Sequence, residues 1–140
     1  MSDTTCLFCR IVKGEIPCAK VYEDSLVLAF LDLGPVQPGH SLVISKAHHE
    51  NLLDTPLDLA PALWTAQRKV GQALMLATGA QGFNVLQNNF SAAGQAVFHV
   101  HWHIIPRVEG DGLPMWTQGG YADAQAMRDM AAAILARVEH

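Results

Sequence analysis

The sequence predicts an α+β fold: a five-stranded antiparallel sheet with one long helix, followed by a second helix at the C-terminus. Short apolar segments of strand length alternate with turns rich in Gly and Pro. Residues 55–79 show the three- or four-residue apolar spacing of an amphipathic helix. The strands follow one another through turns or through this one helix, without regular β-α-β alternation. This arrangement favours antiparallel pairing.

Five segments have the composition of strands. They are 20–23, 24–32, 41–45, 82–88 and 100–106. Gly34-Pro35 and Pro38-Gly39 separate the second from the third with turn chemistry. We therefore expect these two strands to form a hairpin with a longer loop.

The long helix is expected to begin at Thr55, with Pro56 in the first position and Asp58 completing a capping box. Gly79 is a natural C-terminal stop. The apolar face of this long helix consists of Leu59, Leu63, Ala66, Val70, Leu74 and Ala77.

The composition changes after Pro106. Residues 109–120 are rich in Gly and are expected to form a loop. An amphipathic helix follows. Its apolar positions are Met127, Met130, Ala131, Ile134 and Val138. We interpret the chain as a single domain, 1–140, with its core at about 6–107 and a C-terminal loop and helix at 108–140.

Composition excludes several classes of protein. The chain has 140 residues, half of them hydrophobic, which suffices for one buried core. Its net charge of −4 argues against a non-specific nucleic-acid binder but permits a small phosphate ligand. No segment is apolar enough to cross a membrane, and the polar residues 1–5 do not resemble a secretory signal. The odd number of cysteines, three, indicates reduced thiols and a cytoplasmic location.

Three histidines alternate over residues 99–103, where the last strand segment begins: His99, His101 and His103. In an extended strand, such residues lie on one face. A zinc site made from all three is disfavoured, because the outer pair would lie ~13 Å apart at ~3.3 Å per residue. A merely half-polar strand face does not explain three imidazoles in a row. Nucleophilic or acid–base chemistry fits them better.

The segment 99–105, His-Val-His-Trp-His-Ile-Ile, resembles the signature of the histidine triad nucleotide-binding family. The preceding loop, 88–95, resembles the family's phosphate-contacting loop. Residues 29–32 and 38–46 resemble its ribose and base side. The resemblance runs from about residue 6 to 107, and the last thirty or so residues carry no equally specific match.

The resemblance implies that His101 attacks the α-phosphorus of a nucleoside 5′-phosphate derivative. Water then hydrolyses the nucleotidyl-histidine intermediate and releases the nucleoside monophosphate. A neutral imidazole can attack without a separate base if its other nitrogen holds the proton against a fixed acceptor. Phosphoryl transfer depends mainly on positioning and on donors aimed at the phosphate oxygens.

Several residues are candidates for holding the substrate. His103 and His40 are the expected side-chain donors, and Asn88 and Gln95 can donate amide hydrogens to the phosphate. Gly94 permits close approach of the backbone to the phosphate.

Asp32 resembles the family residue that binds the ribose hydroxyls, although a turn aspartate is an alternative interpretation. Phe30 and Leu33 either flank the base or belong to the core. The chain departs from the family at Ala96, where a serine or threonine usually lies beside the leaving group. Removing one such donor can cost ~10²–10³-fold in rate. We therefore expect a slower enzyme, or one whose leaving group is protonated by water or another residue.

Cys6 and Cys9 form a C-x-x-C pair. No βαβ unit surrounds them, which disfavours a thioredoxin-type redox site. Resemblance to the Hint-like, zinc-containing branch of the family implies that His48 and His99 complete a site for Zn²⁺. Two thiolates and two neutral imidazoles would make a closed structural site. The adjacent His49 is a rival to His48.

The resemblance implies hydrolysis of purine nucleoside phosphoramidates, with dinucleoside polyphosphate hydrolysis as the alternative enzyme activity. A nucleotide-binding or scaffolding module with incidental activity is a third possibility, which Ala96 favours. The family also implies a homodimer in which two sheets pair and the long helices pack. Trp64 and Trp116 are candidate interface residues.

Overall fold

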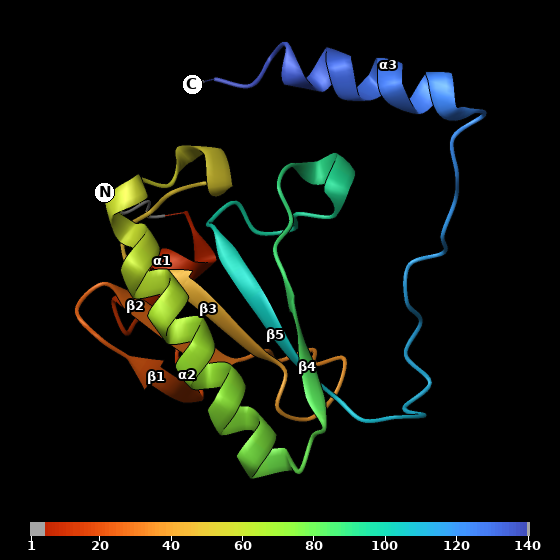
Figure 1. Ribbon diagram of the computed structural model, residues 1–140. Coiled ribbons are helices and arrows are strands. Elements are labelled where there is room, and N and C mark those ends of the chain that lie inside the picture. The colour runs from red at the N-terminus through yellow and green to blue at the C-terminus, as the bar shows by residue number, and fades with distance from the viewer. Residues whose placement is uncertain (1–4, 140) are drawn as a thin grey trace.

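The computed structural model describes residues 5–139 and has the predicted class, so the polar start at 1–4 lies outside the described residues. One antiparallel sheet has the strand order β1-β2-β3-β5-β4 (Figure 1). Its strands are β1 Lys20–Glu23, β2 Val27–Leu31, β3 Ser41–Ser45, β4 Gly82–Leu86 and β5 His101–Arg107. Every predicted strand therefore occurs, and β5 lies between β3 and β4 rather than at an edge.

The long helix α2, Ala60–Thr78, covers one face of the sheet (Figure 1). Its buried side chains Leu63, Val70 and Leu74 form the main core with residues of the strands. The strand residues of this core are Val27, Ala29, Val43 and Ile104. Burial of this apolar stripe fixes α2 against the sheet.

The predicted start of the long helix is wrong. Two short 3₁₀ turns, Leu52–Asp54 and Leu57–Leu59, precede α2, which begins at Ala60. The Thr55 hydroxyl donates to the Asn51 carbonyl oxygen at 2.8 Å and so closes the first turn instead of capping a helix. The predicted C-terminal stop is confirmed, because Gly79 has φ 75° and donates its N–H to the Met75 carbonyl.

The other face of the sheet is covered in part by a short helix that the sequence did not predict, α1, Leu7–Val12. Phe8 from this helix packs with four buried strand residues, Leu28, Phe30, Leu42 and Ile44. With only six residues, α1 is too short to show a helical period. It lies on the face that carries His101 and His103.

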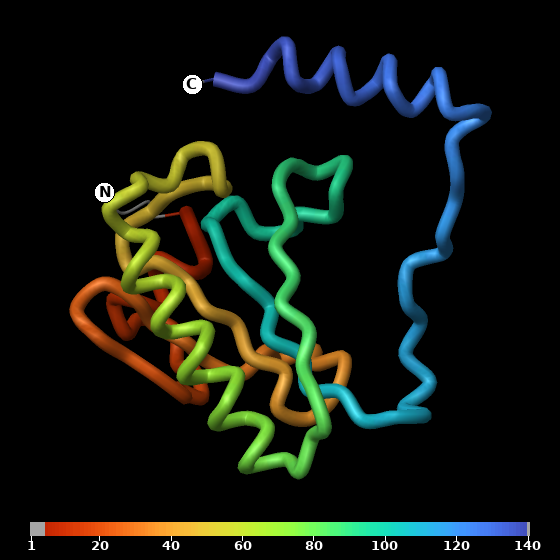
Figure 2. The backbone as a smooth tube through the Cα atoms, in the orientation of Figure 1, coloured from red at the N-terminus to blue at the C-terminus, as the bar shows by residue number. Residues whose placement is uncertain are grey.

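The C-terminal segment leaves the body of the molecule (Figures 1 and 2). It ends in the predicted helix α3, Ala124–Leu135, which stands apart from the sheet and has no buried residue. The side chains of Met127, Met130 and Ile134 are each about half exposed. The apolar face of α3 is therefore uncovered in the single chain. Within residues 5–139, no helix is long and apolar enough to cross a membrane.

Candidate active site and metal centre

Strand β5 carries two of the triad histidines on one face of the sheet. His101 pairs with Ile44 of β3, and His103 pairs with Leu42. Trp102 and Ile104, between and after them, pack on the α2 side. The predicted alternation therefore holds for this pair. His99 precedes the strand, is fully buried, and contacts cysteines instead of continuing the row.

The hydrogen bonds of His101 fix which ring nitrogen carries the proton. Its Nδ1 lies 2.7 Å from the carbonyl oxygen of His99, which can only accept, so Nδ1 bears the hydrogen. The lone pair is therefore on Nε2. Burial lowers the pKa of His101, against the opposing effects of the His99 carbonyl and of Asp32. A buried neutral imidazole with one free lone pair is equipped to act as a nucleophile.

His40 and His103 form a directed pair. The Val36 N–H donates to His40 Nδ1 at 3.0 Å, so the proton of His40 is on Nε2. That N–H donates to His103 Nδ1 at 2.9 Å, which leaves the hydrogen of His103 on Nε2. Burial, followed by the charges of His101 and His40, lowers the pKa of His103 to about 4. The sequence predicts that His40 donates to the phosphate, whereas in the structure its Nε2–H donates to His103. His40 thereby orients His103.

Asp32 lies beside this pair. Its Oδ1 accepts the Gly34 N–H at 2.9 Å, as in a turn, while its Oδ2 lies 3.6 Å from His40 Nε2. The ligand atoms of Asp32, His40 and His103 are close enough to suggest a cation site. However, the Val36 N–H keeps the His40 hydrogen on Nε2, so no lone pair is available there for a metal. We assign no metal to this group.

A cavity of about 450 Å³ lies in front of His101 and His103. One part of its wall is apolar and includes Phe8, Ile11, Phe30, Leu42 and Val97. The other part contains predicted substrate residues, namely Asp32, His40, Asn88 and Gly94, together with Ala96. A cavity with an apolar end and a few convergent polar groups suits a small molecule such as a nucleotide.

The structure corrects the role predicted for Gln95. This side chain is buried and donates its amide hydrogens to the carbonyl oxygens of Glu50, at 2.6 Å, and Val97, at 3.1 Å. Its Oε1 accepts the N–H of Phe90 at 2.8 Å. Phe90 has φ 71° and ψ 156°, a conformation that is essentially restricted to glycine. Gln95 therefore holds a strained loop in place, and both of its amide hydrogens are used within the protein.

Four side chains from distant segments form the candidate metal centre, Cys6, Cys9, His48 and His99, and their ligand atoms all lie within 4.8 Å of one another. Cys6 Sγ is 3.4 Å from His99 Nδ1, and Cys9 Sγ is 3.3 Å from His48 Nδ1 and 3.5 Å from His99 Nδ1. A tetrahedral zinc ion with Zn–S bonds of ~2.3 Å and Zn–N bonds of ~2.0–2.1 Å separates S and N ligands by ~3.5 Å. The donor set fits that ion.

The second nitrogen of His99 supports the same assignment. His99 Nε2 lies 2.7 Å from the Ser45 carbonyl oxygen and so carries the hydrogen. The lone pair is then on Nδ1, which faces the two sulfur atoms. Burial, as the main cause, lowers the pKa of His99 to about 4, so the ring is neutral, as a ligand must be. The geometry also selects His48 over His49, whose ring is not part of this group.

A comparison with protein families agrees with this geometry. The family model described as the HIT domain matches residues 13–110. The chain belongs to the HIT family. The match begins after the cysteine pair and ends just beyond β5, so it includes all three triad histidines.

Two HIT relatives have names that describe an activity. A protein of Arabidopsis thaliana named adenylylsulfatase HINT3 is 47% identical over 108 residues, which cover 77% of this chain and 55% of that relative. The aligned region thus spans about half the length of the plant protein. A Schizosaccharomyces pombe protein named adenosine 5′-monophosphoramidase hnt1 is 47% identical over 107 residues, which cover 74% of each chain.

Solved structures of similar proteins share the fold. A crystal structure of a Streptococcus mutans protein superposes with a TM-score of 0.92 at 41% identity, covering 99% of this chain and 88% of that one. A zinc-bound histidine triad family protein from Mycobacterium smegmatis superposes with a TM-score of 0.76 at 33% identity, covering 96% and 98% of the two chains.

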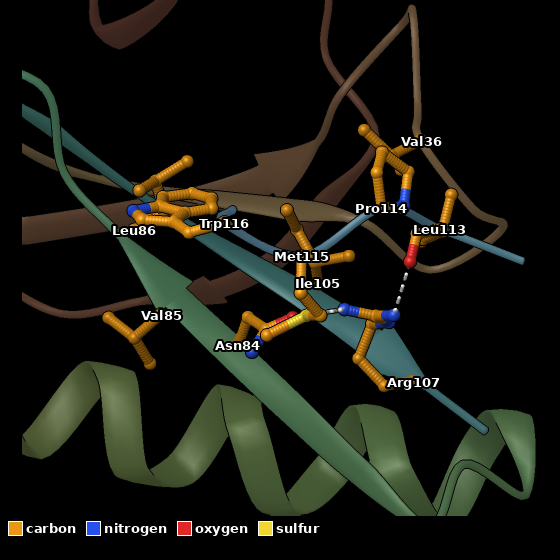
Figure 3. Close-up of a pocket in the computed structure, with 10 residues that line it drawn as sticks. All are labelled: Val36, Asn84, Val85, Leu86, Ile105, Arg107, Leu113, Pro114, Met115 and Trp116. Atoms are coloured by element: carbon orange, nitrogen blue, oxygen red, sulfur yellow. Dashed lines mark hydrogen bonds between the residues drawn. The ribbon is translucent and has the colours of Figure 1, made fainter. Parts of the chain in front are cut away.

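A second groove of about 470 Å³ adjoins the cavity in front of His101 in this HIT protein (Figure 3). Three apolar residues line both, Val36, Leu86 and Ile105. Arg107 at its edge binds Asp111 through two hydrogen bonds of 2.7 and 2.9 Å and donates to Asn84 and to the Leu113 carbonyl. This guanidinium holds the pKa of the Asp111 carboxyl well below its usual range. The Arg107 contacts thereby fix the start of the C-terminal segment.

Sequence reasoning missed three groups that shape the site. The Val36 N–H and the Ser45 carbonyl set the protonation of His40 and His99, and backbone groups have no signature in residue type. Phe8 contacts the rings of both His99 and His101. Its position in the sequence, as an aromatic residue between the two cysteines, is a signal that could have pointed to it.

Proposed function

We propose that this HIT protein is a nucleotide hydrolase whose preferred substrate is a purine nucleoside phosphoramidate. The observation that carries the proposal is the state of His101. Its Nδ1–H is engaged by the His99 carbonyl, and its remaining lone pair is in a ring that lines the cavity. The name of the fission yeast relative, an adenosine 5′-monophosphoramidase, supports the choice of the P–N bond.

In the first step, His101 Nε2 forms a bond to the α-phosphorus and the P–N bond to the leaving amine breaks. The amine takes its proton from solvent water, and the Nε2–H of the neutral His103 ring serves as a hydrogen-bond donor to the phosphate or the leaving amine without giving up its proton. In the second step, water attacks the phosphorus and releases a proton to solvent, the bond to His101 breaks, and the nucleoside monophosphate leaves. His40 acts on both steps indirectly, because it keeps His103 in its donor form.

The cavity suggests how the rest of the substrate binds. Its apolar wall, with Phe8 and Phe30, suits a purine ring, and Asp32 lies where ribose hydroxyls can donate to its carboxylate. Asn88 and Gly94 line the phosphate end. Gly94 has φ 92°, and a Cβ there would lie 3.6 Å from Nδ2 of the Asn88 side chain. A side chain at residue 94 would therefore narrow this end of the cavity.

The decisive experiment traps the intermediate. After brief incubation with adenosine 5′-phosphoramidate and rapid quenching at alkaline pH, peptide mass spectrometry is expected to find adenylate on His101. Turnover of the phosphoramidate is expected to exceed that of diadenosine tetraphosphate. The reverse order would favour the dinucleoside polyphosphate hydrolase, and binding of AMP with no adenylate on His101 would favour the binding module.

Replacing Ala96 with serine is expected to raise turnover of the phosphoramidate. Ala96 lines the cavity, and a hydroxyl there adds a donor beside the leaving group. One such donor can contribute ~10²–10³-fold to the rate, so we expect an increase of at least ~5-fold in kcat. Ala92→Ser, which adds the same hydroxyl in the same loop outside the cavity, is the control. An unchanged or lower kcat in Ala96→Ser contradicts this role.

We further propose that Cys6, Cys9, His48 and His99 hold a structural zinc ion. Support comes from the separations of their sulfur and nitrogen atoms and from the zinc-bound mycobacterial structure. Such an ion would tie α1 to the segment just before β5 and so contribute to folding stability. Thiolate ligands require a reducing compartment, so we place the protein in the cytoplasm.

We also propose a homodimer, paired through the edge strand β4. None of the five residues of β4 is charged, and the strand pairs in unbroken register with β5. The opposite edge strand, β1, is interrupted in register and carries Lys20 and Glu23. Natural proteins protect free edges with charges and bulges, so an unprotected edge indicates a partner. The exposed Trp64 and Trp116, and the uncovered apolar face of α3, are consistent with a second copy.

Val85→Lys is expected to convert such a dimer to a monomer. Val85 is in β4 and is about half exposed, so a charge there opposes pairing of two identical edges. Light scattering after size exclusion measures the mass. Val21→Lys places the same charge on the other edge, at similar exposure, and is expected to remain dimeric. A Val85→Lys protein with the mass of wild type contradicts pairing through β4.

A further inference from the structure

We infer that Phe8 is a positioning residue that couples the metal centre to the nucleophile, so that metal and nucleotide each strengthen the binding of the other. The inference rests on the proposed function, because it assumes that the cavity takes a nucleotide. It goes beyond that function by joining two sites that the chemistry itself does not connect.

The Phe8 ring contacts both the metal centre and the nucleophile. Phe8 lies between the two cysteines of the metal centre, and only 5% of it is exposed. Its ring centroid is 5.2 Å from that of His101 at an interplanar angle of 89°, and 5.9 Å from that of His99 at 71°. It also packs edge-on against Phe30 at 5.5 Å. A metal ligand, the nucleophile and the cavity wall therefore share one neighbour.

The position of Phe8 depends on the metal centre because α1 is short. A helix of six residues is not stable by itself. Cys6 is its N-cap and accepts the Cys9 N–H on Sγ at 3.3 Å, so the first turn of α1 is built from the two metal-binding thiols. A bound metal fixes that turn to His48 and His99. Without it, α1 is held mainly by the burial of Phe8 and its apolar neighbours.

The direction of the His101 lone pair depends in turn on Phe8. The single hydrogen bond from His101 Nδ1 to the His99 carbonyl fixes one atom of the ring but allows the ring to tilt about that contact. The rings of Phe8 and His103 both pack against His101, with centroids 5.2 and 5.1 Å away, and Phe8 thereby limits this tilt. Phosphoryl transfer depends on alignment of the nucleophile, so a loosened Phe8 is expected to lower kcat.

The coupling acts in both directions. Phe8 also lines the cavity, so a purine packed against it holds α1, and thereby Cys6 and Cys9, in the metal-binding arrangement. Linkage requires that if nucleotide tightens metal binding by some factor, metal tightens nucleotide binding by the same factor. A factor of about 5 or more is typical of coupled sites.

The first test measures zinc release and needs no activity. Zinc-loaded protein is mixed with a chromogenic chelator, with and without saturating AMP. We expect AMP to slow zinc release at least ~5-fold in the wild type and to have little effect in Phe8→Leu. Phe30→Leu, which removes a ring from the same wall without touching His101, is expected to retain the effect of AMP. Zinc release that ignores AMP in the wild type overturns the inference, as does a protein that binds no zinc.

The second test separates positioning from folding. Phe8→Leu is expected to lower kcat about 10-fold, and the ¹⁵N signals of His101 are expected to shift from a single Nδ1–H form toward a mixture. Phe30→Leu is expected to act mainly on KM. Unchanged kcat and unchanged His101 signals in folded Phe8→Leu overturn the positioning role. The zinc-release test on the wild type needs no variant, so it decides the coupling even if Phe8→Leu does not fold.

The two proposals fail in different ways. If adenylate never forms on His101 but AMP still slows zinc release, the coupling stands and the hydrolase proposal is wrong. If adenylate forms and zinc release ignores AMP, the hydrolase stands and the coupling is wrong.

Discussion

Replacing His101 with asparagine is expected to lower kcat by roughly 10⁴-fold or more while leaving AMP binding within a few-fold of wild type. An asparagine amide can still donate to the His99 carbonyl, so the local hydrogen bond is retained. It has no lone pair capable of attacking phosphorus. Single-turnover kinetics with adenosine 5′-phosphoramidate, together with calorimetric titration of AMP, measure the two quantities.

His103→Asn is the matched control for this experiment. His103 is expected to contribute less to the rate than His101, because it donates a hydrogen bond and forms no bond to phosphorus. We expect a loss of about 10²–10³-fold and continued formation of adenylate on His101. Activity of His101→Asn within 10-fold of wild type, or adenylate on another residue, contradicts the assignment of the nucleophile.

The spacing of the histidines predicted much of this site. Alternation at His99, His101 and His103 predicts one face of one strand, and the structure places the last two there. His99 departs from the row because β5 begins only at His101, so that His99, two residues before the strand, can turn toward Cys6 and Cys9. A period-two pattern gives the face of a strand but does not say where the strand begins.

The sequence could not specify how the polar side chains are used. His40 and Gln95 were both expected to donate to the phosphate, and both donate within the protein instead. Their roles depend on backbone groups such as the Val36 N–H and the Glu50 carbonyl, which every residue type offers. The helix start predicted at Thr55 is wrong for a related reason. The Thr55 hydroxyl can cap a helix or close a turn, and the choice depends on the local path of the chain.

The candidate metal ligands could be predicted from the sequence only in part. The C-x-x-C spacing predicts that Cys6 and Cys9 lie close together, and the structure builds them into one helical turn. Residue type alone offers no physical ground for preferring His48 over its neighbour His49. The path of the chain after β3 decides it, because the His48 ring reaches Cys9 Sγ while the His49 carbonyl accepts the Val100 N–H.

Replacing Cys6 with serine is expected to lower the melting temperature by about 10 °C, with loss of stoichiometric zinc. A ligand present at 100 to 1,000 times its dissociation constant stabilises the folded state by ~3–4 kcal/mol. For a chain of this size, that corresponds to roughly 10 °C. Turnover per folded molecule is expected to fall less than ~10-fold, because the metal does not touch the reacting atoms and its loss loosens Phe8 without removing the ring that packs on His101. Calorimetry, metal analysis and kinetics at low temperature measure the three effects.

Paired histidine variants show whether the loss comes from the metal. His48→Gln removes a ligand and is expected to match Cys6→Ser in zinc content and melting temperature. His49→Gln changes the adjacent imidazole, which lies outside the group, and is expected to keep one zinc ion per chain. If wild-type protein contains no stoichiometric zinc, or if His48→Gln and His49→Gln behave alike, the four residues do not form a structural metal site. The close S···N separations would then reflect only thiol–imidazole hydrogen bonds, which contribute about 1 kcal/mol each.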